Sequence, residues 1–586
     1  LIPPGLDQVL VGSVDRSRQP ELRAAFVLGV GERFFPAVGS EDTLFGETER
    51  LLLAEFDFRL GPTSSERTLY EQYLGYIAFT RAAEYLWVSY PLAGDDGRAL
   101  APSPFISRLR ALFPELQPQQ VGNEPAGKVA EALPWLTSPR KVAAFAVRCL
   151  RSGGASCWLS AAKMYLHDPD VQFILQSLYH RNLETPLPRS MTRVLVGDPL
   201  YASVSRFESF AACPFNHFAQ YMLRLAERRE YRVQHTDIGI LVHETLHRFV
   251  QHLRKQGQRL SDLTHDEAVA LIDGLVDDVA PRLHHRVFMS NARYRYLVKR
   301  IKHLLRTTLQ VWVRHSTEGQ FSPIATELGF GGQGDALPAA RIDLPAGVRV
   351  FLQGRIDRVD ACRQTDVVYA RVIDYKGSGS GFSVSDAYHG LRIQLVVYLD
   401  VVRQAIEAGL LGDYHQLTVQ PAGAYYFNVR EPTVDTTQPM DDDEWEKSLL
   451  KKLRLEGVTL HSGEAIRLAE ESGQGMLIPA RLKKDGEPYQ DPLVATQERL
   501  EALFRVVRQR MRGFAERIMA GDVSPYPYRY PERRLSGCRF CPYHVVCHFD
   551  PLVPGNYYRQ LEYRENRRAW EWLDEPTGGM SDAQVD

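Results

Sequence analysis

The residues from Val350 to Tyr398 set the architecture of this chain and read VFLQGRIDRVDACRQTDVVYARVIDYKGSGSGFSVSDAYHGLRIQLVVY. Two apolar runs typical of β-strands each deliver a carboxylate, Asp357 and Asp374. Lys376 follows Asp374 by two residues, and side chains two apart on a strand share a face. Gln394 and Tyr398 are four residues apart, which puts them on one face of a helix. The stretch therefore predicts oxygen ligands on neighbouring strands, a lysine beside them, and a helix laid over the site.

These residue types indicate metal-assisted phosphate chemistry. Carboxylates such as Asp357 and Asp374 hold Mg²⁺ or Mn²⁺, which prefer oxygen ligands and retain bound water. Such a metal lowers the pKa of a bound water and polarises a phosphorus centre. Lys376 would position that water or stabilise charge on the phosphate oxygens. The alternative is structural: aspartates often cap turns, and GRIDRVD could be a hairpin held by Arg355 and Arg358.

A second motif lies upstream, where residues His243 to His247 read HETLH. The pattern H-E-x-x-H on a helix is typical of zinc proteases. No third ligand motif follows, and the sequence after His247 is RFV instead of the extended metalloprotease continuation. A second interpretation is that His243 joins Asp357 and Asp374 around one cation. A third is an ordinary core or surface histidine.

Four of the seven cysteines form a pattern of their own. Three occur as C-x2-C-x5-C in GCRFCPYHVVC, and a chain of this length needs no disulfide to stabilise it, so we predict thiolate ligation of metal. A fourth ligand is expected from the CPF sequence of Cys213, which resembles the CPY sequence of Cys541. Spacing alone suits zinc and an iron–sulfur cluster equally. Cys149, Cys157 and Cys362 lie in apolar sequence and are predicted to be core residues.

Composition sets broad limits on the protein class. The chain has 586 residues, 44% of them hydrophobic and 24% charged, which is typical of a globular protein of about three to five domains. It has no apolar run of about 18 residues and no secretory leader, so we expect a cytoplasmic protein without membrane contact. It opens at Leu1 in what reads as the middle of a domain, so we expect a piece of a longer protein.

The net charge of −2 leaves nucleic-acid binding to local patches. The best candidate stretch spans residues 293–306, RYRYLVKRIKHLLR, where cations alternate with aromatic residues that can stack on bases. The alternative is a solvated helix face. The predicted DNA contacts are Arg293, Arg295, Lys299, Arg300 and Lys302.

The N-terminal part is organised differently. A strand–loop–strand pattern precedes the helical LYEQYLGYIAFTRAAEYLWVSYP, in which Thr80-Arg81 leads into a strand. This resembles the last motifs of the second RecA-like lobe of UvrD-type helicases, where the arginine corresponding to Arg81 reaches a nucleotide held by another lobe. An ordinary surface arginine is the alternative. A match to G-x4-G-K at residues 122–128 is followed by Val129 instead of Ser or Thr, so we expect no complete ATPase site in this chain.

Order along the chain predicts an α/β protein. Helices are expected near residues 128–150 and 161–179. A pair of helices broken at Pro214 should follow, and helices should continue to about Leu305. Strands follow from about Ile324 to Val372 and again at Ala422–Val429, and a charged linker leads to a long helix at Thr496–Ala520. The predicted parts are a partial helicase lobe (1–95), a linker and helical region (96–200), an α/β domain with the acidic motifs and the four-cysteine pattern (201–550), and a C-terminal extension with a polar tail (551–586).

The motifs GRIDRVD, VIDYKGS, GILVH and the Q-x3-Y helix together resemble the RecB-family branch of the PD-(D/E)xK nucleases. The four-cysteine pattern is similar to the iron–sulfur staple of a subgroup of them. With the helicase-like region ahead, the whole pattern resembles the B-subunit family of AddAB-type helicase–nucleases. The resemblance implies that residues 201–550 are a nuclease domain, with a mixed sheet flanked by helices and closed by the cluster. One departure is Asp374, where many relatives carry Glu.

The resemblance implies roles for particular residues. Metal ligands would be His243, Asp357, Asp374 and the backbone carbonyl of Tyr375. Lys376 would be catalytic, with Gln394 and Tyr398 supporting it. A [4Fe–4S] cluster would be held by Cys213, Cys538, Cys541 and Cys547.

The resemblance also implies an activity and a partner. The chain would be a Mg²⁺-dependent exodeoxyribonuclease that cuts a single DNA strand. It would work as a heterodimer with an AddA-type helicase–nuclease subunit that processes double-strand ends for recombinational repair. The alternatives are a catalytically inert DNA-binding or scaffold subunit and, more distantly, a zinc protease.

Overall fold

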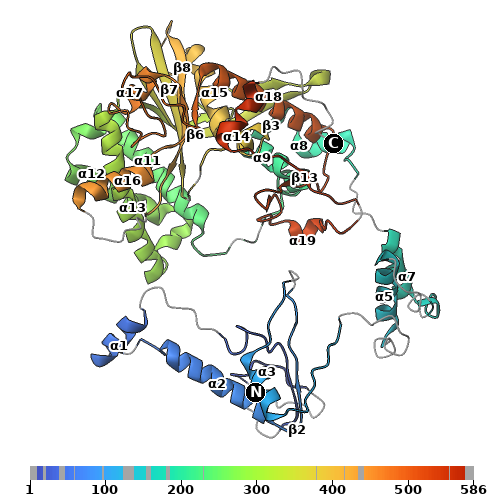
Figure 1. The fold of residues 1–586 in the computed structure, drawn as a ribbon. Helices are drawn as coiled ribbons and strands as arrows, with labels where there is room; N and C mark the ends of the chain where they lie inside the picture. Colours follow the sequence, from blue (N-terminus) through green and yellow to red (C-terminus); the bar gives the residue numbers. More distant parts are fainter. Residues whose placement is uncertain are drawn as a thin grey trace. The chain divides into compact units, whose positions relative to one another are not determined.

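The structure is a computed structural model of the chain (Figure 1). It contains two compact units, residues 1–178 and 179–586, and each is described by itself. None of the described helices is long and apolar enough to span a membrane. The structure describes residues 9–16, 22–37, 46–58, 60–94, 98–122, 137–152, 160, 162–179, 185–226, 228, 230–377, 379, 381–414, 416–432, 441–553 and 555–574.

The first unit contains a parallel strand pair with a helix between the strands in sequence. Strand β1 (Leu22–Val27) pairs with β2 (Ala82–Val88), and α2 (Ser64–Thr80) leads directly into β2. Thr63 begins α2 with a capping box, which satisfies the first free N–H groups of the helix. A shorter helix, α1 (Glu47–Glu55), precedes α2. The predicted helix–strand junction at Thr80-Arg81 is confirmed.

The sequence after β2 is more than a linker. It forms α3 (Pro104–Leu112), and Phe105 packs edge-on against Phe35 and Phe79. A Cβ on Gly75 would lie 2.5 Å from the Phe105 ring, so glycine permits this close contact. Aromatic burial therefore draws a segment rich in Pro and Gly into the core of the unit.

Two further helices lie in the first unit, α5 (Pro139–Ser152) and α7 (Pro169–Gln176), and a 3-10 turn, η2 (Ser177–Tyr179), follows them. They overlap the helices expected near 128–150 and 161–179, although both begin later in the sequence. Residues 123–129 of the rejected G-x4-G-K match, and Cys157, lie outside the described residues.

The second unit is built on one mixed sheet with the strand order β10-β9-β8-β7-β6-β3, with β4 and β5 also pairing with β6. Neighbours β6 and β7 are antiparallel, whereas β7 and β8 are parallel. The predicted mixed central sheet is confirmed. The strands are β3 (Leu200–Ser203), β4 (Ser322–Phe330), β5 (Ala340–Asp343), β6 (Arg349–Arg363), β7 (Val367–Lys376), β8 (Thr418–Asn428), β9 (Glu456–Leu460) and β10 (Val494–Ala495).

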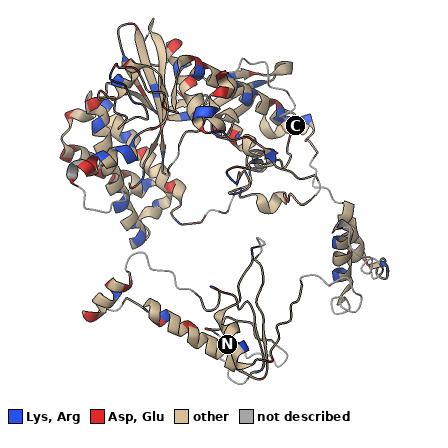
Figure 2. Cartoon of the chain, in the orientation of Figure 1, with Lys and Arg blue, Asp and Glu red and all other residues tan. Residues whose placement is uncertain are grey.

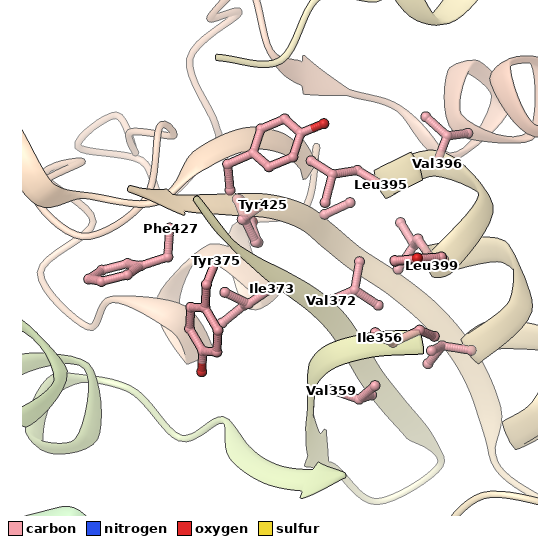
Figure 3. Packing of buried hydrophobic residues seen from close by; sticks show 14 of the residues in the cluster. Ile356, Val359, Val372, Ile373, Tyr375, Leu395, Val396, Leu399, Tyr425 and Phe427 are labelled. Atoms are coloured by element: carbon pink, nitrogen blue, oxygen red, sulfur yellow. The ribbon is translucent and has the colours of Figure 1, made fainter. Parts of the chain in front are cut away.

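Helices cover both faces of this sheet (Figure 1). Nearly all of β7 is buried, as expected of a strand covered on both sides. Figure 3 shows Tyr375 and Phe427 on one side of β7, with Val372 and the α15 residue Leu395 on the other. One layer contains α11 (His235–Gln256), α12 (His265–Val279) and α13 (Ala292–Glu318), and the other contains α9 (Val204–Ala212), α15 (Gln394–Glu407) and α18 (Gln497–Met519).

The predicted charged linker between β8 and α18 is wrong for most of its length. It contains α16 (Asp442–Leu453), β9 and α17 (Gly463–Ala469). The short sequence GVTL at 457–460 is buried and pairs antiparallel with β8. Because the segments around it are rich in charged residues, the sequence pattern does not indicate this strand.

The C-terminal segment folds back on the sheet domain. After α18 comes a small sheet of β11 (Tyr528–Tyr530), β12 (Leu535–Ser536) and β13 (Arg559–Gln560), with α19 (His544–Cys547) between β12 and β13. Beyond it, Trp570 and Leu573 lie in the main core, and α21 (Glu571–Asp574) contacts α18. Residues 575–586 lie outside the described part of the chain.

Candidate metal centre and cysteine cluster

The centre of the site lies where β6, β7 and α11 meet. The Asp357 carboxylate accepts a hydrogen bond from the Tyr375 N–H (2.8 Å) and lies 3.3 Å from His243 Nδ1. His243 Nε2 lies 3.0 Å from the carbonyl oxygen of Tyr375. The structure therefore brings together three of the four predicted metal ligands, and both ring nitrogens of His243 face oxygen atoms.

Facing two oxygens changes the proton affinity of the histidine. Burial lowers the pKa of His243, but the hydrogen bond and negative charge of Asp357 outweigh it, so the pKa is raised overall. A cation bound between the same oxygens and one ring nitrogen would replace that proton. The donor set of one imidazole, carboxylates and a backbone carbonyl suits a hard divalent cation.

Asp374, the second predicted carboxylate, belongs to a network of hydrogen-bonded polar side chains. Asp374 lies 2.7 Å from Lys376 Nζ and accepts a hydrogen bond from Gln394 Nε2 (2.8 Å). Lys376 donates to Gln394 Oε1 (3.2 Å), and Gln394 Nε2 also contacts the Tyr398 hydroxyl (3.3 Å). Alternation along β7 turns Asp374 and Lys376 toward α15. The predicted clustering of these four side chains is thus present.

Burial is the main influence on the pKa of Asp374. Burial and the negative charge of Asp357 raise the pKa, and the positive charge of Lys376 lowers it. The net result is a pKa of about 6. A carboxyl group that is costly to ionise alone is one that gains from a bound cation.

Glu327 is a site residue that the sequence analysis missed. It lies on β4 between two residues that pair with Ile356 and Arg358, and so stands across from Asp357. Together with His243 and Asp357 it forms the group of described residues whose potential ligand atoms lie within 4.8 Å of one another. Burial, followed by the charge of Asp357, raises its pKa. The one available signal was a lone carboxylate in an otherwise apolar strand, IATELGF.

The backbone at Glu327 is also unusual. Its φ is +48°, in the left-handed region that non-glycine residues rarely adopt, in the middle of a strand. Such strain concentrates at functional sites, where the surrounding structure holds it in place. Here the pairing with β6 on either side of Glu327 fixes its carboxylate beside Asp357.

Glu208 is a second residue that the sequence analysis missed. From α9, its Oε1 accepts hydrogen bonds from the N–H groups of Ile393 (2.8 Å) and Gln394 (3.1 Å), at the start of α15. These are free donors of the first helical turn, where a carboxylate is also favoured by the helix dipole. Burial nevertheless raises its pKa to about 7. Glu208 thus fixes the end of α15 that carries Gln394.

A buried charge network supports the opposite side of β7. Asp360 is fully buried and accepts hydrogen bonds from Arg358 (2.6 and 3.1 Å) and Arg371 (3.0 and 2.9 Å). The Arg358 guanidinium lies 4.8 Å from the Trp312 ring centroid, and Trp312 packs against Tyr375. Tyr375 in turn contacts Asp357 and His243 through its backbone. The network therefore holds the backbone that carries the site.

The zinc-protease interpretation of HETLH is wrong. Glu244 is engaged by Arg248 (2.6 Å), and His247 is not part of the group that could hold a metal among the described residues. His243 instead turns toward the strands of the sheet.

The four predicted thiol ligands gather at the C-terminal sheet. Cys213 follows α9 and is buried, and Cys538, Cys541 and Cys547 are partly buried. Burial raises the pKa of Cys213 to about 11 and that of Cys538 to about 12, with neighbouring thiols of the group adding to both. No three of these described sulfurs lie within 4.8 Å of one another.

A close backbone contact brings the two parts of the thiol group together. A Cβ on Gly537 would lie 2.8 Å from the Ala212 carbonyl oxygen. Ala212 precedes Cys213 and Gly537 precedes Cys538, so the absence of a side chain at 537 lets two distant cysteines approach.

The predicted DNA contacts all lie on α13, where several have protein partners. Arg300 pairs with Glu431 (2.5 Å), Lys302 with Asp277 (2.7 Å), and Arg295 donates to the Met289 carbonyl. Arg293 and Lys299 are exposed. Figure 2 shows acidic and basic residues mixed over the helices of this layer. Arg81, in the first unit, is the C-cap residue of α2.

Comparison with known proteins gives a consistent result. The chain is 39% identical over 585 residues to the B subunit of the ATP-dependent helicase/deoxyribonuclease of Symbiobacterium thermophilum, covering 97% of this chain and 49% of that protein. It is 40% identical over 571 residues to the protein of the same name from Moorella thermoacetica, covering 96% and 49%. This chain thus spans about half the length of these relatives. The model of the PD-(D/E)XK nuclease superfamily matches residues 201–548, more than half of the chain, and the protein belongs to that superfamily.

Proposed function

We propose that this chain is the nuclease-bearing part of the B subunit of a helicase–nuclease and that it hydrolyses DNA phosphodiester bonds. The observation that carries the proposal is the convergence of His243, Asp357, Asp374 and Lys376 at one end of the sheet. The name that the relatives share, B subunit of a helicase/deoxyribonuclease, supports the same activity.

The metal would be Mg²⁺ or Mn²⁺, held by His243, Asp357, Asp374 and the Tyr375 carbonyl, with Glu327 completing the set. When bound, it supplies an activated water and polarises the scissile phosphate. The protein's own contribution is to hold these ligands in place through the Tyr375 backbone. A bound cation would then offset the free-energy cost of burying the negative charge of Asp374.

Lys376 would act at the phosphate. Its ammonium group is placed by Asp374 and by Gln394, so its position is set by both β7 and α15. There it stabilises negative charge that builds up on phosphate oxygens during hydrolysis. Tyr398 and Gln394 keep the chain of hydrogen bonds in one arrangement.

The cysteines would hold a [4Fe–4S] cluster as a structural group. The approach of Cys213, at the end of α9, to the C-terminal loop of the other three cysteines supports it, because the backbones of Ala212 and Gly537 meet there. Because Cys213 is more than 300 residues from the other three ligands, the cluster would join the two ends of the nuclease domain and resist their separation.

The remaining parts of the proposal concern substrate and partner. We propose that the nuclease acts as an exonuclease on a single DNA strand, with Arg293 and Lys299 as exposed contacts on α13. The first unit would be part of a helicase-like lobe, with Arg81 near its nucleotide. An AddA-type subunit would be the partner in the cytoplasm, and the complex would process double-strand ends for recombinational repair.

The test is cleavage of end-labelled single-stranded DNA in Mg²⁺ by anaerobically purified protein. Wild type is compared with Asp374→Asn and with the matched control Asp343→Asn, an exposed aspartate paired with Arg341. We expect metal-dependent degradation by wild type and control, and a loss of at least about 100-fold in Asp374→Asn. Binding without cleavage by the wild type, even with its partner subunit added, would support the inert subunit instead.

A further inference from the structure

Two arginines beside the cysteine cluster have no carboxylate partner among the described residues. Arg559, on β13, donates to the carbonyl oxygen of Ala211, and its Nε is buried without a hydrogen-bond partner. Arg510, on α18, donates to the Tyr388 carbonyl (3.0 Å) and lies 5.2 Å from that ring's centroid. Nearby Arg517 differs, because Asp522 pairs with it at 2.6 Å.

Arg559 lies near Cys213, the first ligand of the thiol group, and Arg510 and Arg517 lie near Arg559. Ala211, which accepts the hydrogen bond from Arg559, is two residues before Cys213. Cys213, Arg517 and Arg510 are all close enough to Arg559 to influence its charge. Among the described residues, Asp522 is the one carboxylate paired with any of these three guanidinium groups, which leaves an excess of positive charge.

Such an excess calls for an anion. Charged side chains that leave water are normally paired, because their desolvation is otherwise uncompensated. Asp522 is already paired with Arg517. The thiols beside Arg559 could supply the remaining negative charge, and they do so only as thiolates. An iron–sulfur core held by four thiolates carries a net negative charge, and its reduction adds more.

We propose that Arg559, with Arg510 behind it, is the counter-charge of the cluster held by Cys213, Cys538, Cys541 and Cys547. This inference rests on the proposed cluster and deepens it. Arg559 is a positioning residue: it neutralises the thiolate-bound group and holds the end of α9 from which Cys213 extends. Because it stabilises negative charge, it favours the reduced form of the cluster over the oxidised form.

A simpler role must be separated from this one. A cation that binds a carbonyl in the last turn of a helix stabilises that helix without any cluster. In that case the hydrogen bond to Ala211 would matter, and the charge facing Cys213 would not. The test therefore needs one substitution of Arg559 that removes its charge and another that keeps the charge but alters its hydrogen-bonding geometry.

The experiment uses the whole chain purified without oxygen, as wild type, Arg559→Gln and Arg559→Lys. Arg533→Gln is the matched control, since Arg533 is an exposed arginine between β11 and β12 whose guanidinium lies 4.5 Å from the Tyr563 ring centroid. The readouts are iron and sulfide per chain, the rate at which the cluster's visible absorbance is lost in air, and the midpoint potential of the cluster. Melting temperature reports folding separately.

We expect Arg559→Gln to lose the cluster at least about tenfold faster than wild type and to have a lower midpoint potential, because removal of a cation disfavours reduction. Arg559→Lys keeps the charge and should stay near wild type, as should Arg533→Gln. If Arg559→Gln does not fold, Arg510→Gln should show the same two changes to a smaller extent.

Two results would overturn the inference alone while leaving the cluster intact. One is an Arg559→Gln protein with wild-type iron content, lifetime and potential. The other is an Arg559→Lys protein as impaired as Arg559→Gln, which would indicate the helix-end role. Wild-type protein that contains zinc or no metal would instead overturn the cluster, and with it the inference. None of these results bears on the nuclease, which Asp374→Asn tests.

Discussion

At the scale of single residues, Glu327 occupies a position in the site that nothing in its local sequence predicted. It takes a strained backbone conformation so that its carboxylate lies beside Asp357 and His243. Two carboxylates held this close repel each other unless a cation lies between them. The strain is therefore explained if Glu327 is a ligand of the metal.

This leads to a prediction for Glu327→Gln, which keeps the shape of the side chain but removes its charge. We expect the affinity for Mg²⁺ to fall by about 10- to 100-fold, with cleavage recovered in part at high Mg²⁺. Calorimetric titration with Mn²⁺ measures the affinity directly. Glu431→Gln, a change at an exposed glutamate paired with Arg300, is the control. Unaltered metal affinity in Glu327→Gln would remove this residue from the site.

Glu208 gives a prediction about pH. Its pKa is raised from 4.5 to about 7, so between these values the folded protein holds a proton that the unfolded chain has lost. The free energy of unfolding of metal-free protein therefore falls as pH rises through this window. Glu208→Gln keeps an acceptor for Ile393 and Gln394 but cannot ionise.

We expect Glu208→Gln to match wild type at pH 4 and to exceed it by about 1–3 kcal/mol at pH 8. Urea unfolding in the presence of EDTA, repeated across this range, measures the difference. A constant difference between the two proteins at every pH would show that Glu208 is not the titrating group.

At the scale of elements, the site depends on the two faces of β7. One face carries Asp374 and Lys376 toward α15, and the other carries Tyr375 toward Trp312 and the Arg358–Asp360 network. The Tyr375 backbone between them holds both Asp357 and His243. One strand thus joins the proposed metal ligands, the proposed catalytic lysine and a buried charge network that supports them.

The junction of α9 with the C-terminal cysteine loop gives a second prediction at this scale. A methyl group at residue 537 would meet the Ala212 carbonyl oxygen at 2.8 Å and the Tyr528 ring at 3.3 Å. Gly537→Ala should push Cys538 away from Cys213, and we expect iron content to fall by more than half. The conservative control is Gly513→Ala, where an added Cβ has nothing within 4 Å. Full iron occupancy in Gly537→Ala would mean that the loop adjusts without cost to the cluster.

At the scale of the whole molecule, the chain consists of two units with separate cores. The proposed metal ligands and the four cysteines of the proposed cluster lie in residues 179–586. A ligand that binds only one folded unit stabilises that unit alone.

Calorimetry of the whole chain should therefore show two transitions. With Mg²⁺ at about 100 times its Kd, we expect only the transition of residues 179–586 to rise, by about 3–5 °C. EDTA should reverse the shift. Asp374→Asn should show two transitions that do not respond to Mg²⁺. A single transition, or an equal rise in both, would contradict independent units.

Features that depend on local spacing could be predicted from the amino-acid sequence. Asp374 and Lys376 share a face because they are two apart on a strand, and Gln394 and Tyr398 because they are four apart on a helix. The break at Pro214 and the junction at Thr80-Arg81 are also local, and each was predicted. These relations hold wherever the segment lies in the fold.

Features that depend on residues distant in sequence could be recognised only in the folded protein. Glu327 and Glu208 reach the site from β4 and α9, and neither carries a local pattern that marks it. Asp277 and Glu431, which pair with cations of α13, are also distant in sequence, and the burial of β9 within a charged segment depends on β8. The physical reason is that burial and charge pairing depend on neighbours in space, which local periodicity does not specify.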